Sequence, residues 1–137
     1  MTKTRVAVLT NGSLLWQAEV RAEMALADVV LPSLDAGDEV LFRAVNRPHP
    51  SITFEKLLSG LTDFRREFSG QYWLEVLLLA GYTDLMAHVR KIAKLARQIG
   101  PDKVQLNTAV RPPAEELAMP VPRKRLAELA RLFKPSA

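Results

Sequence analysis

The chain has 137 residues and no cysteine, with 48% hydrophobic residues, 25% charged residues and a formal net charge of +4. This length fits a single domain over residues 1–137 with a sizeable core, and the composition excludes disordered and fibrous proteins. Without cysteine, the chain forms no disulfide and supplies no thiolate for an iron–sulfur cluster or a structural zinc ion.

The chain begins with a pattern typical of a strand followed by a helix. Residues 5–10 are rich in β-branched residues and are followed by Asn11-Gly12, which predicts a strand that ends in a tight turn. From Trp16 to Ala27, apolar residues recur every four positions, at Val20 and Met24. This spacing predicts a helix.

The next stretch, Val30 to Ala36, is the one around which the rest of the chain is organised. Its apolar run switches abruptly to Ser33 and Asp35, which predicts a buried strand with two polar side chains at its carboxyl end. Proteins with parallel sheets bind their ligands at that end. Because side chains alternate along a strand, Ser33 and Asp35 point to the same face.

Two predicted helices separate this strand from the next. Residues 38–45 have helical spacing and are followed by the prolines of residues 47–50, which end the helix. A longer helix begins near Thr53 and stops at Ser69-Gly70. Tyr72 to Ala80 is then an almost continuous apolar run, as in a central parallel strand covered on both faces.

The last third of the chain repeats the alternation of helix and strand. Asp84 is a good N-cap for a helix that Gly100-Pro101 breaks, and Lys103 to Thr108 is the fourth predicted strand. After a loop rich in proline, Pro122 suits the first turn of a final amphipathic helix that extends to Phe133.

Alternating strands and helices predict a parallel sheet with helical crossovers. Periodicity alone leaves open whether this sheet is a partial barrel or an open doubly wound sheet. Polar residues on one face of every strand favour the barrel, because they suggest a common lumen. We therefore predict an α/β fold, a partial (β/α) barrel of about four parallel strands with helices outside. The predicted lumen residues are Asn11, Ser33, Asp35, Glu75, Gln105 and Asn107, whereas Val30, Val76, Leu78, Val104 and Leu106 face the helices.

Several polar residues have two readings. Ser33 and Asp35 can cap the next helix or bind a ligand. Asn11 can bind a ligand or simply form the Asn-Gly turn. Glu75 costs several kcal/mol inside an apolar strand unless it is paired or hydrated, so it is either a structural salt bridge or a substrate or cofactor contact. Arg47 and Arg111 each precede a proline, where an arginine can bind a carboxylate or simply lie at the surface.

Other features predict no site. His49 and His88 lack partners at metal-ligand spacing, so we predict no metal site. Residues 123–125, Arg-Lys-Arg, are read as a solvated helix start, with a nucleic-acid contact as the weaker alternative. Because no apolar run approaches the roughly 20 residues of a membrane span and no secretory signal is visible, we expect a cytoplasmic protein without membrane contact.

Five motifs occur in order along almost the whole chain. They are Leu-Thr-Asn-Gly-Ser-Leu-Leu from Leu9, Pro-Ser-Leu-Asp-Ala-Gly-Asp-Glu from Pro32, Asn-Arg-Pro-His from Asn46, Trp-Leu-Glu-Val from Trp73 and Gln-Leu-Asn-Thr from Gln105. Any one motif arises by chance, but five in order are specific. Together they resemble the later part of radical S-adenosylmethionine (radical SAM) proteins, in the group of iron–sulfur oxidoreductases similar to the wyosine-base synthases of tRNA modification.

The resemblance implies that the chain corresponds to the third through sixth units of a six-unit partial barrel. In that family the first unit carries three cysteines that hold a 4Fe-4S cluster, and the second carries a Gly-Glu motif that grips the methionine amino group; neither motif occurs here. The resemblance also implies contacts to S-adenosylmethionine, although the family's Gly-x-Asn reads Gly81-Tyr82-Thr83 in this chain. The implied cofactor-binding residues are Asn11, Ser33, Asp35, Gly81 and Asn107; Arg47, Glu75 and Arg111 stay the candidate substrate or anion contacts on the chemistry of their side chains.

The function expected from the resemblance is a truncated or split radical SAM domain that keeps part of the S-adenosylmethionine-binding mouth. We expect no activity from the chain alone. It would contribute to radical chemistry only if a partner chain supplied the missing units. The alternative is a non-catalytic binding or assembly module, such as a homodimer of half barrels that pairs through the edge of the strand at residues 5–10.

Overall fold

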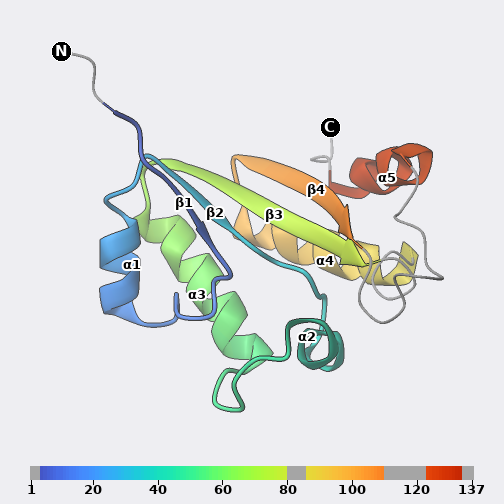
Figure 1. Ribbon diagram of the computed structural model, residues 1–137, viewed down its shortest axis with the longest axis horizontal. Helices are drawn as coiled ribbons and strands as arrows, with labels where there is room; N and C mark the ends of the chain where they lie inside the picture. The colour runs from blue at the N-terminus through green and yellow to red at the C-terminus, as the bar shows by residue number, and fades with distance from the viewer. Residues whose placement is uncertain (1–3, 80–85, 110–122, 134–137) are drawn as a thin grey trace.

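The computed structural model describes residues 4–79, 86–109 and 123–133, and it contains one sheet of four parallel strands (Figure 1). The strands lie in the order β1 (Ala7–Thr10), β2 (Val29–Pro32), β3 (Gln71–Leu79) and β4 (Lys103–Ala109). Every neighbouring pair in this sheet is parallel. The predicted α/β fold with four parallel strands is therefore confirmed.

The strands are separated by helices, as predicted. These are α1 (Ala18–Met24), α2 (Glu39–Asn46), α3 (Phe54–Glu67), α4 (Met86–Ile99) and α5 (Arg123–Ala130), which continues into a short 3-10 turn, η2 (Arg131–Phe133). Helices α1, α3 and α4 lie along one face of the sheet (Figure 1). Within the described ranges, no helix has the length and hydropathy to cross a membrane.

The core lies between this face of the sheet and the helices. On β3, Tyr72, Leu74, Val76 and Leu78 are fully buried, whereas Trp73, Glu75 and Leu77 on the other face are only partly buried. Burial on every second residue is the pattern of a strand with one face against helices. Among the described residues, β3 is therefore fully covered on one face and only partly covered on the other, which differs from the predicted coverage of both faces. The helix side of the core comes from α3 and α4, chiefly Leu57, Leu61, Phe64, Val89, Ile92 and Ala96.

The strand predicted at Val30 to Ala36 is shorter in the structure, and its end is irregular. Its ladder with β3 pairs Val29 with Gln71 and Val30 with Tyr72, and then resumes as a single bridge between Ser33 and Glu75. The backbone of β2 leaves the sheet after Leu34, whose N–H donates to the carbonyl of Glu75 at 2.8 Å. Beyond that point the Asp35 side chain, in place of the β2 backbone, accepts the next N–H of β3.

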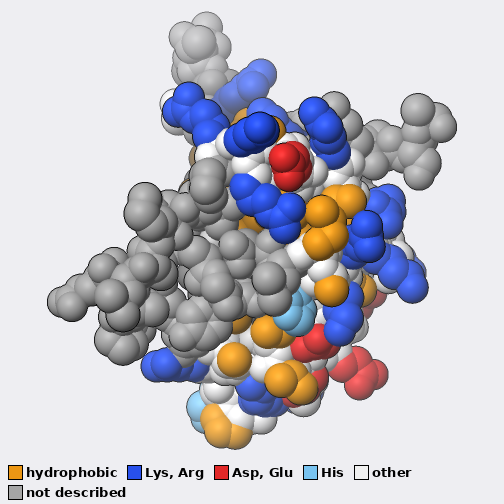
Figure 2. All heavy atoms as spheres, turned by 90° about the vertical axis from the view of Figure 1, so that its right-hand side faces the viewer, with side chains coloured by type: hydrophobic (Ala, Val, Ile, Leu, Met, Phe, Trp, Pro, Cys, Tyr) orange, Lys and Arg blue, Asp and Glu red, His pale blue; other side chains and the backbone are white. Residues whose placement is uncertain are grey.

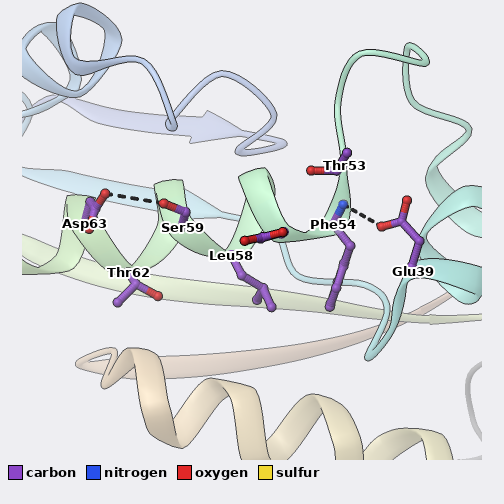
Figure 3. A pocket seen from close by; sticks show the side chains of 8 residues that line it. Glu39, Thr53, Phe54, Leu58, Ser59, Thr62 and Asp63 are labelled. Carbon is purple, nitrogen blue, oxygen red and sulfur yellow. Dashed lines mark hydrogen bonds between the residues drawn. The ribbon is translucent and has the colours of Figure 1, made fainter.

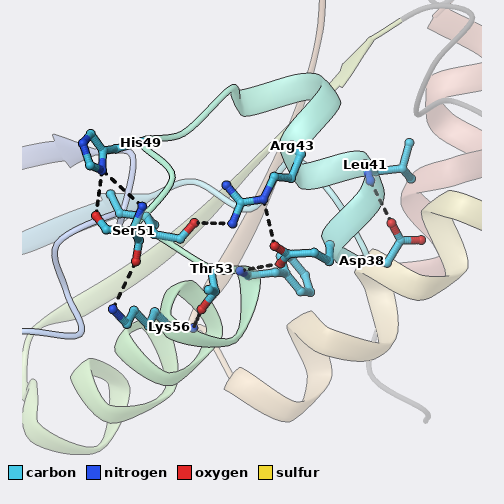
Figure 4. A network of polar contacts seen from close by, with 10 residues as sticks. Asp38, Leu41, Arg43, His49, Ser51, Thr53 and Lys56 are labelled. Carbon is cyan, nitrogen blue, oxygen red and sulfur yellow. Dashed lines mark hydrogen bonds and ion pairs between the residues drawn. The ribbon is translucent and has the colours of Figure 1, made fainter.

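Polar side chains fix the segment between α2 and α3 (Figure 4). The His49 Nδ1 lies 2.7 Å from the Ser51 hydroxyl, and the Lys56 ammonium donates to the Ser51 carbonyl at 3.1 Å. Glu39 accepts from Arg43 Nε at 2.9 Å and, through its other oxygen, from the first N–H of α3 at 2.7 Å. His49 therefore has a structural partner in this loop.

Candidate functional site

A row of polar side chains crosses three neighbouring strands, from the carboxyl end of β2 to the middle of β3 and β4. Ser33 at the end of β2 pairs with Glu75 of β3, and Glu75 pairs with Gln105 of β4. Residues paired in a parallel sheet point to the same face, and Glu75 points away from the fully buried residues of β3. The three side chains therefore stand side by side on the face opposite the helices.

Asp35 lies two residues beyond Ser33, past the end of β2. Its Oδ1 accepts the N–H of Leu77 at 2.9 Å, which is the bond that a continuing β2 backbone would have made. Burial raises the pKa of the Asp35 carboxyl, hydrogen bonds from the Leu77 N–H and the Asn46 side chain oppose that rise, and the nearby charge of Glu75 adds to it. A partly buried carboxylate is therefore held just past the end of β2, close to a second one.

Neither Ser33 nor Asp35 caps the next helix, so that structural reading is wrong. The N-cap of α2 is Asp38, whose side chain accepts the Leu41 N–H at 2.8 Å and pairs with the Lys91 ammonium at 3.0 Å. These contacts lower the pKa of the Asp38 carboxyl, the Leu41 bond having the largest effect. Since Asp38 fills the capping role, Ser33 and Asp35 remain at the sheet's polar end.

Glu75 has no ion pair with any cation in the described part of the chain. A structural salt bridge therefore does not account for it among these residues. Its partly buried carboxylate instead faces the same side as Ser33 and Gln105. This position can accept a hydrogen bond from a hydroxyl or an amine of a bound molecule.

The other predicted site residues are placed less closely together. Asn107 pairs with Leu77 in the ladder, so it lies level with the Asp35 contact on β4 and on the same face. Asn11 follows Thr10, which pairs with Pro32, and its Oδ1 accepts the Ser13 N–H at 3.0 Å, as in a turn. Arg47 is exposed, with φ 46° at the C-cap of α2. Gly81 and Arg111 lie outside the described residues.

Asn46 is a site residue that the sequence reasoning missed. Its side chain is hydrogen-bonded to Asp35, 11 positions earlier in the chain, from the last turn of α2. It belongs to the Asn-Arg-Pro-His motif, which was quoted above only for its resemblance. That motif was the available signal, but nothing in its spacing indicates a contact with the end of β2.

A hollow of about 790 Å³ lies elsewhere, on α2 and α3 (Figure 3). It contains none of the strand-end residues, and its Glu39 is already committed to the α3 N-terminus. Across the described ranges, no group of three or more His, Cys, Asp or Glu side chains could hold a metal ion. The polar row from the end of β2 across β3 and β4 is therefore the better candidate site.

Replacing Asp35 tests the electrostatics of this site. Because the folded-state pKa of Asp35 lies above its ordinary 3.8, the folded chain retains a proton that the unfolded chain has released over the interval between the two values. Wild-type stability should therefore fall as pH rises through that interval. Asp35→Asn keeps an oxygen for the Leu77 N–H but cannot ionise, so its melting temperature relative to wild type should rise between pH 4 and pH 7. Thermal unfolding followed by circular dichroism measures this; a difference that is constant with pH would contradict the assignment.

Comparison with known proteins gives relatives of greater length and solved structures of similar fold. No protein-family sequence model matches the chain. It is 44% identical over 118 residues to a Brachyspira hyodysenteriae protein named GTPase Obg, a match that covers 86% of this chain and 17% of that protein. It is 33% identical over 115 residues to a UPF0026 protein of Methanocaldococcus jannaschii, covering 84% of this chain and 36% of the relative. The chain thus spans about a third or less of the length of these relatives.

Solved structures of similar fold include a radical SAM protein. A radical SAM methyltransferase from Sphaerobacter thermophilus superposes with a TM-score of 0.65 at 20% identity, covering 93% of this chain and 36% of that one. A domain of pyruvate-formate lyase-activating enzyme from Bacteroides vulgatus superposes with a TM-score of 0.68 at 14% identity, covering 93% of this chain and 73% of the domain. At these identities, the likeness shows the fold alone. The chain has a radical SAM-like α/β fold.

Proposed function

We propose that this chain forms one wall of an S-adenosylmethionine-binding mouth and takes part in radical chemistry only together with β/α units that carry cluster-binding cysteines. The observation that supports the proposal is the in-register row Ser33, Glu75 and Gln105, with Asp35 two residues beyond Ser33. Open α/β sheets bind ligands at the carboxyl ends of their strands. We propose S-adenosylmethionine as the ligand of this row because the chain has a radical SAM-like fold.

The residues present fit the nucleoside part of S-adenosylmethionine. The Asp35 and Glu75 carboxylates are acceptors suited to ribose hydroxyls, and the amides of Gln105 and Asn107 both donate and accept. A carboxylate already held by Leu77 and Asn46 keeps its position without a ligand, which reduces the cost of ordering it on binding.

The same residues do not fit the 4Fe-4S cluster, because the chain has no cysteine to ligate iron. In a complete domain, cysteines of the other β/α units would hold the cluster, which would supply electrons to S-adenosylmethionine. The role proposed for this chain is therefore to bind and orient the nucleoside, not to carry the electron.

The name of the Brachyspira relative does not lead to a GTPase proposal for this chain. The match covers only 17% of that protein. The sequence also contains no Gly-x-x-x-x-Gly-Lys-Ser/Thr stretch, the loop with which such enzymes cradle nucleotide phosphates.

A second candidate function is an assembly module without catalysis, in which two half barrels pair. It is favoured by β1, which pairs with β2 alone among the described strands and carries Leu9 with 70% of its surface exposed. An unpaired strand edge is a template for a further strand.

Calorimetry with S-adenosylhomocysteine tests the proposed mouth. Binding should be measurable but weaker than roughly 1 μM, about 8 kcal/mol, because the cluster and the amino-group anchor are missing. Asp35→Asn should weaken it by about tenfold, since a hydrogen bond to a charged group contributes about 1.5–3 kcal/mol. Asp63→Asn, the same exchange on the surface of α3, is the matched control. Equal affinity for both variants, or no heat at millimolar ligand, would refute the proposal.

A further inference from the structure

A basic hollow lies on the outside of the fold, apart from the strand ends. It has a volume of about 360 Å³ and is lined by Arg90, Ala93, Lys94, Arg97 and Leu132. The three cations follow at intervals of four and three residues along α4, so they stand on one side of this helix. Ala93 and Leu132 give the hollow an apolar floor between them.

The packing of η2 against α4 fixes one side of this hollow. Arg97 Nη1 donates to the Leu132 carbonyl at 2.8 Å, and Leu129 at the end of α5 is fully buried in the core. Arg90 and Lys94 are exposed, with no acidic partner among the residues that the structure describes. The hollow is therefore lined by the hydrogen-bonded Arg97, the exposed Arg90 and Lys94, and two apolar residues.

The positive charge continues from α4 onto α5. Residues 86–99 and 123–133 carry eight of the 19 Lys and Arg residues but only one of the 15 acids, Glu128, which pairs with Arg125 at 3.5 Å. Figure 2 shows Lys and Arg side chains gathered over the upper part of this end of the molecule, with little acidic surface among them. We call Arg90, Lys94, Arg97, Arg123, Lys124 and Arg131 the basic face.

We propose that the basic face binds the phosphodiester backbone of a nucleic acid. Four of its six cations are arginines, whose planar guanidinium matches phosphate geometry. The cations extend over two helices, beyond the hollow and beyond the reach of one small anion, which suits a polymer of phosphates. The net charge of the whole chain is only +4, so it does not reveal that basic residues are concentrated on this face.

A membrane surface fits the basic face less well. An amphipathic helix that lies in a lipid surface buries large apolar side chains beside its cations. Within the described ranges, the exposed large hydrophobic side chains lie on other elements: Val6, Leu9, Leu14, Trp16, Leu26 and Val40. None of them belongs to α4, α5 or η2.

Fluorescence anisotropy with a fluorescein-labelled DNA duplex of about 20 base pairs tests the proposal. The logarithm of the binding constant should fall with the logarithm of salt with a slope of about −4, as for four or five neutralised phosphates. Arg90→Gln/Lys94→Gln should reduce the slope by about 2 and weaken binding by about tenfold at low salt. Arg5→Gln/Arg66→Gln makes the same change in net charge away from the basic face and should leave binding within about twofold of wild type.

Three results would overturn the proposal. Equal losses from both double variants would mean that net charge alone drives binding. Inorganic phosphate that displaces the duplex beyond the effect of its ionic strength would indicate a small-anion site. Polyglutamate or phosphatidylserine vesicles that bind as tightly as the duplex would indicate another partner. If Arg90→Gln/Lys94→Gln fails to fold by circular dichroism, Arg123→Gln/Lys124→Gln on α5 replaces it, with the same expected loss.

Discussion

Reconstitution of the purified chain with ferrous iron and sulfide is expected to leave it without a 4Fe-4S cluster and without production of 5′-deoxyadenosine from S-adenosylmethionine. Thiolates are the ligands that hold such clusters, and the chain has no cysteine. The carboxylates at the strand ends do not replace them, because hard oxygen ligands suit magnesium, calcium and manganese. We therefore expect no 5′-deoxyadenosine at all, and not merely slow production.

The control for this experiment is a cysteine-containing radical SAM protein reconstituted in the same solutions. Iron and sulfide analysis, the visible spectrum and chromatography of the nucleoside product measure the outcome. Four irons per chain together with 5′-deoxyadenosine would show that this chain carries a complete site, which the proposal of one wall of a mouth excludes.

The exposed edge of β1 is expected to cause association, and Leu9→Lys is expected to abolish it. The carbonyls of Val6 and Thr10 accept hydrogen bonds from the segment that contains β2. Because backbone groups alternate along a parallel strand, those of Ala7 and Leu9 point to the open edge. A lysine at Leu9, which is 70% exposed, places a charge where a new strand would pack and leaves the core intact.

Light scattering at increasing concentration measures this association. Leu26→Lys is the matched control, since Leu26 is 86% exposed and lies in the loop after α1, outside the β1 strand. Wild type and Leu26→Lys should associate equally, and Leu9→Lys should stay monomeric. A monomeric wild type with slow amide exchange at Ala7 and Leu9 would mean that the edge is already covered, and both the partner and the half-barrel proposals would lose their basis.

The fold was predictable because hydrophobic periodicity marks each strand and helix in turn. Tyr72 to Ala80 reads as one strand, and β3 covers Gln71–Leu79. The parity argument placed Glu75 and Gln105 on one face, and the ladder pairs them. Burial of alternate residues is a local property, so a single sequence records it.

The details of the strand ends were less predictable, because they depend on contacts between distant segments. Asp35 and Asp38 have the same side chain three positions apart, yet one accepts from β3 and the other caps α2. The contact between Asn46 and Asp35 depends on how α2 folds back toward β2. No periodicity in the sequence encodes either choice.

The most direct test of the proposed mouth is a titration of the isotopically labelled chain with S-adenosylhomocysteine, followed by backbone amide chemical shifts. The account predicts the largest shifts at Ser33, Asp35, Leu77, Gln105 and Asn107, and little change on the outer surfaces of α3 and α4. Weak binding suits this measurement, because fast exchange lets each amide be followed. Shifts confined to the helices, or none at millimolar ligand, would contradict an S-adenosylmethionine mouth at the carboxyl end of this sheet.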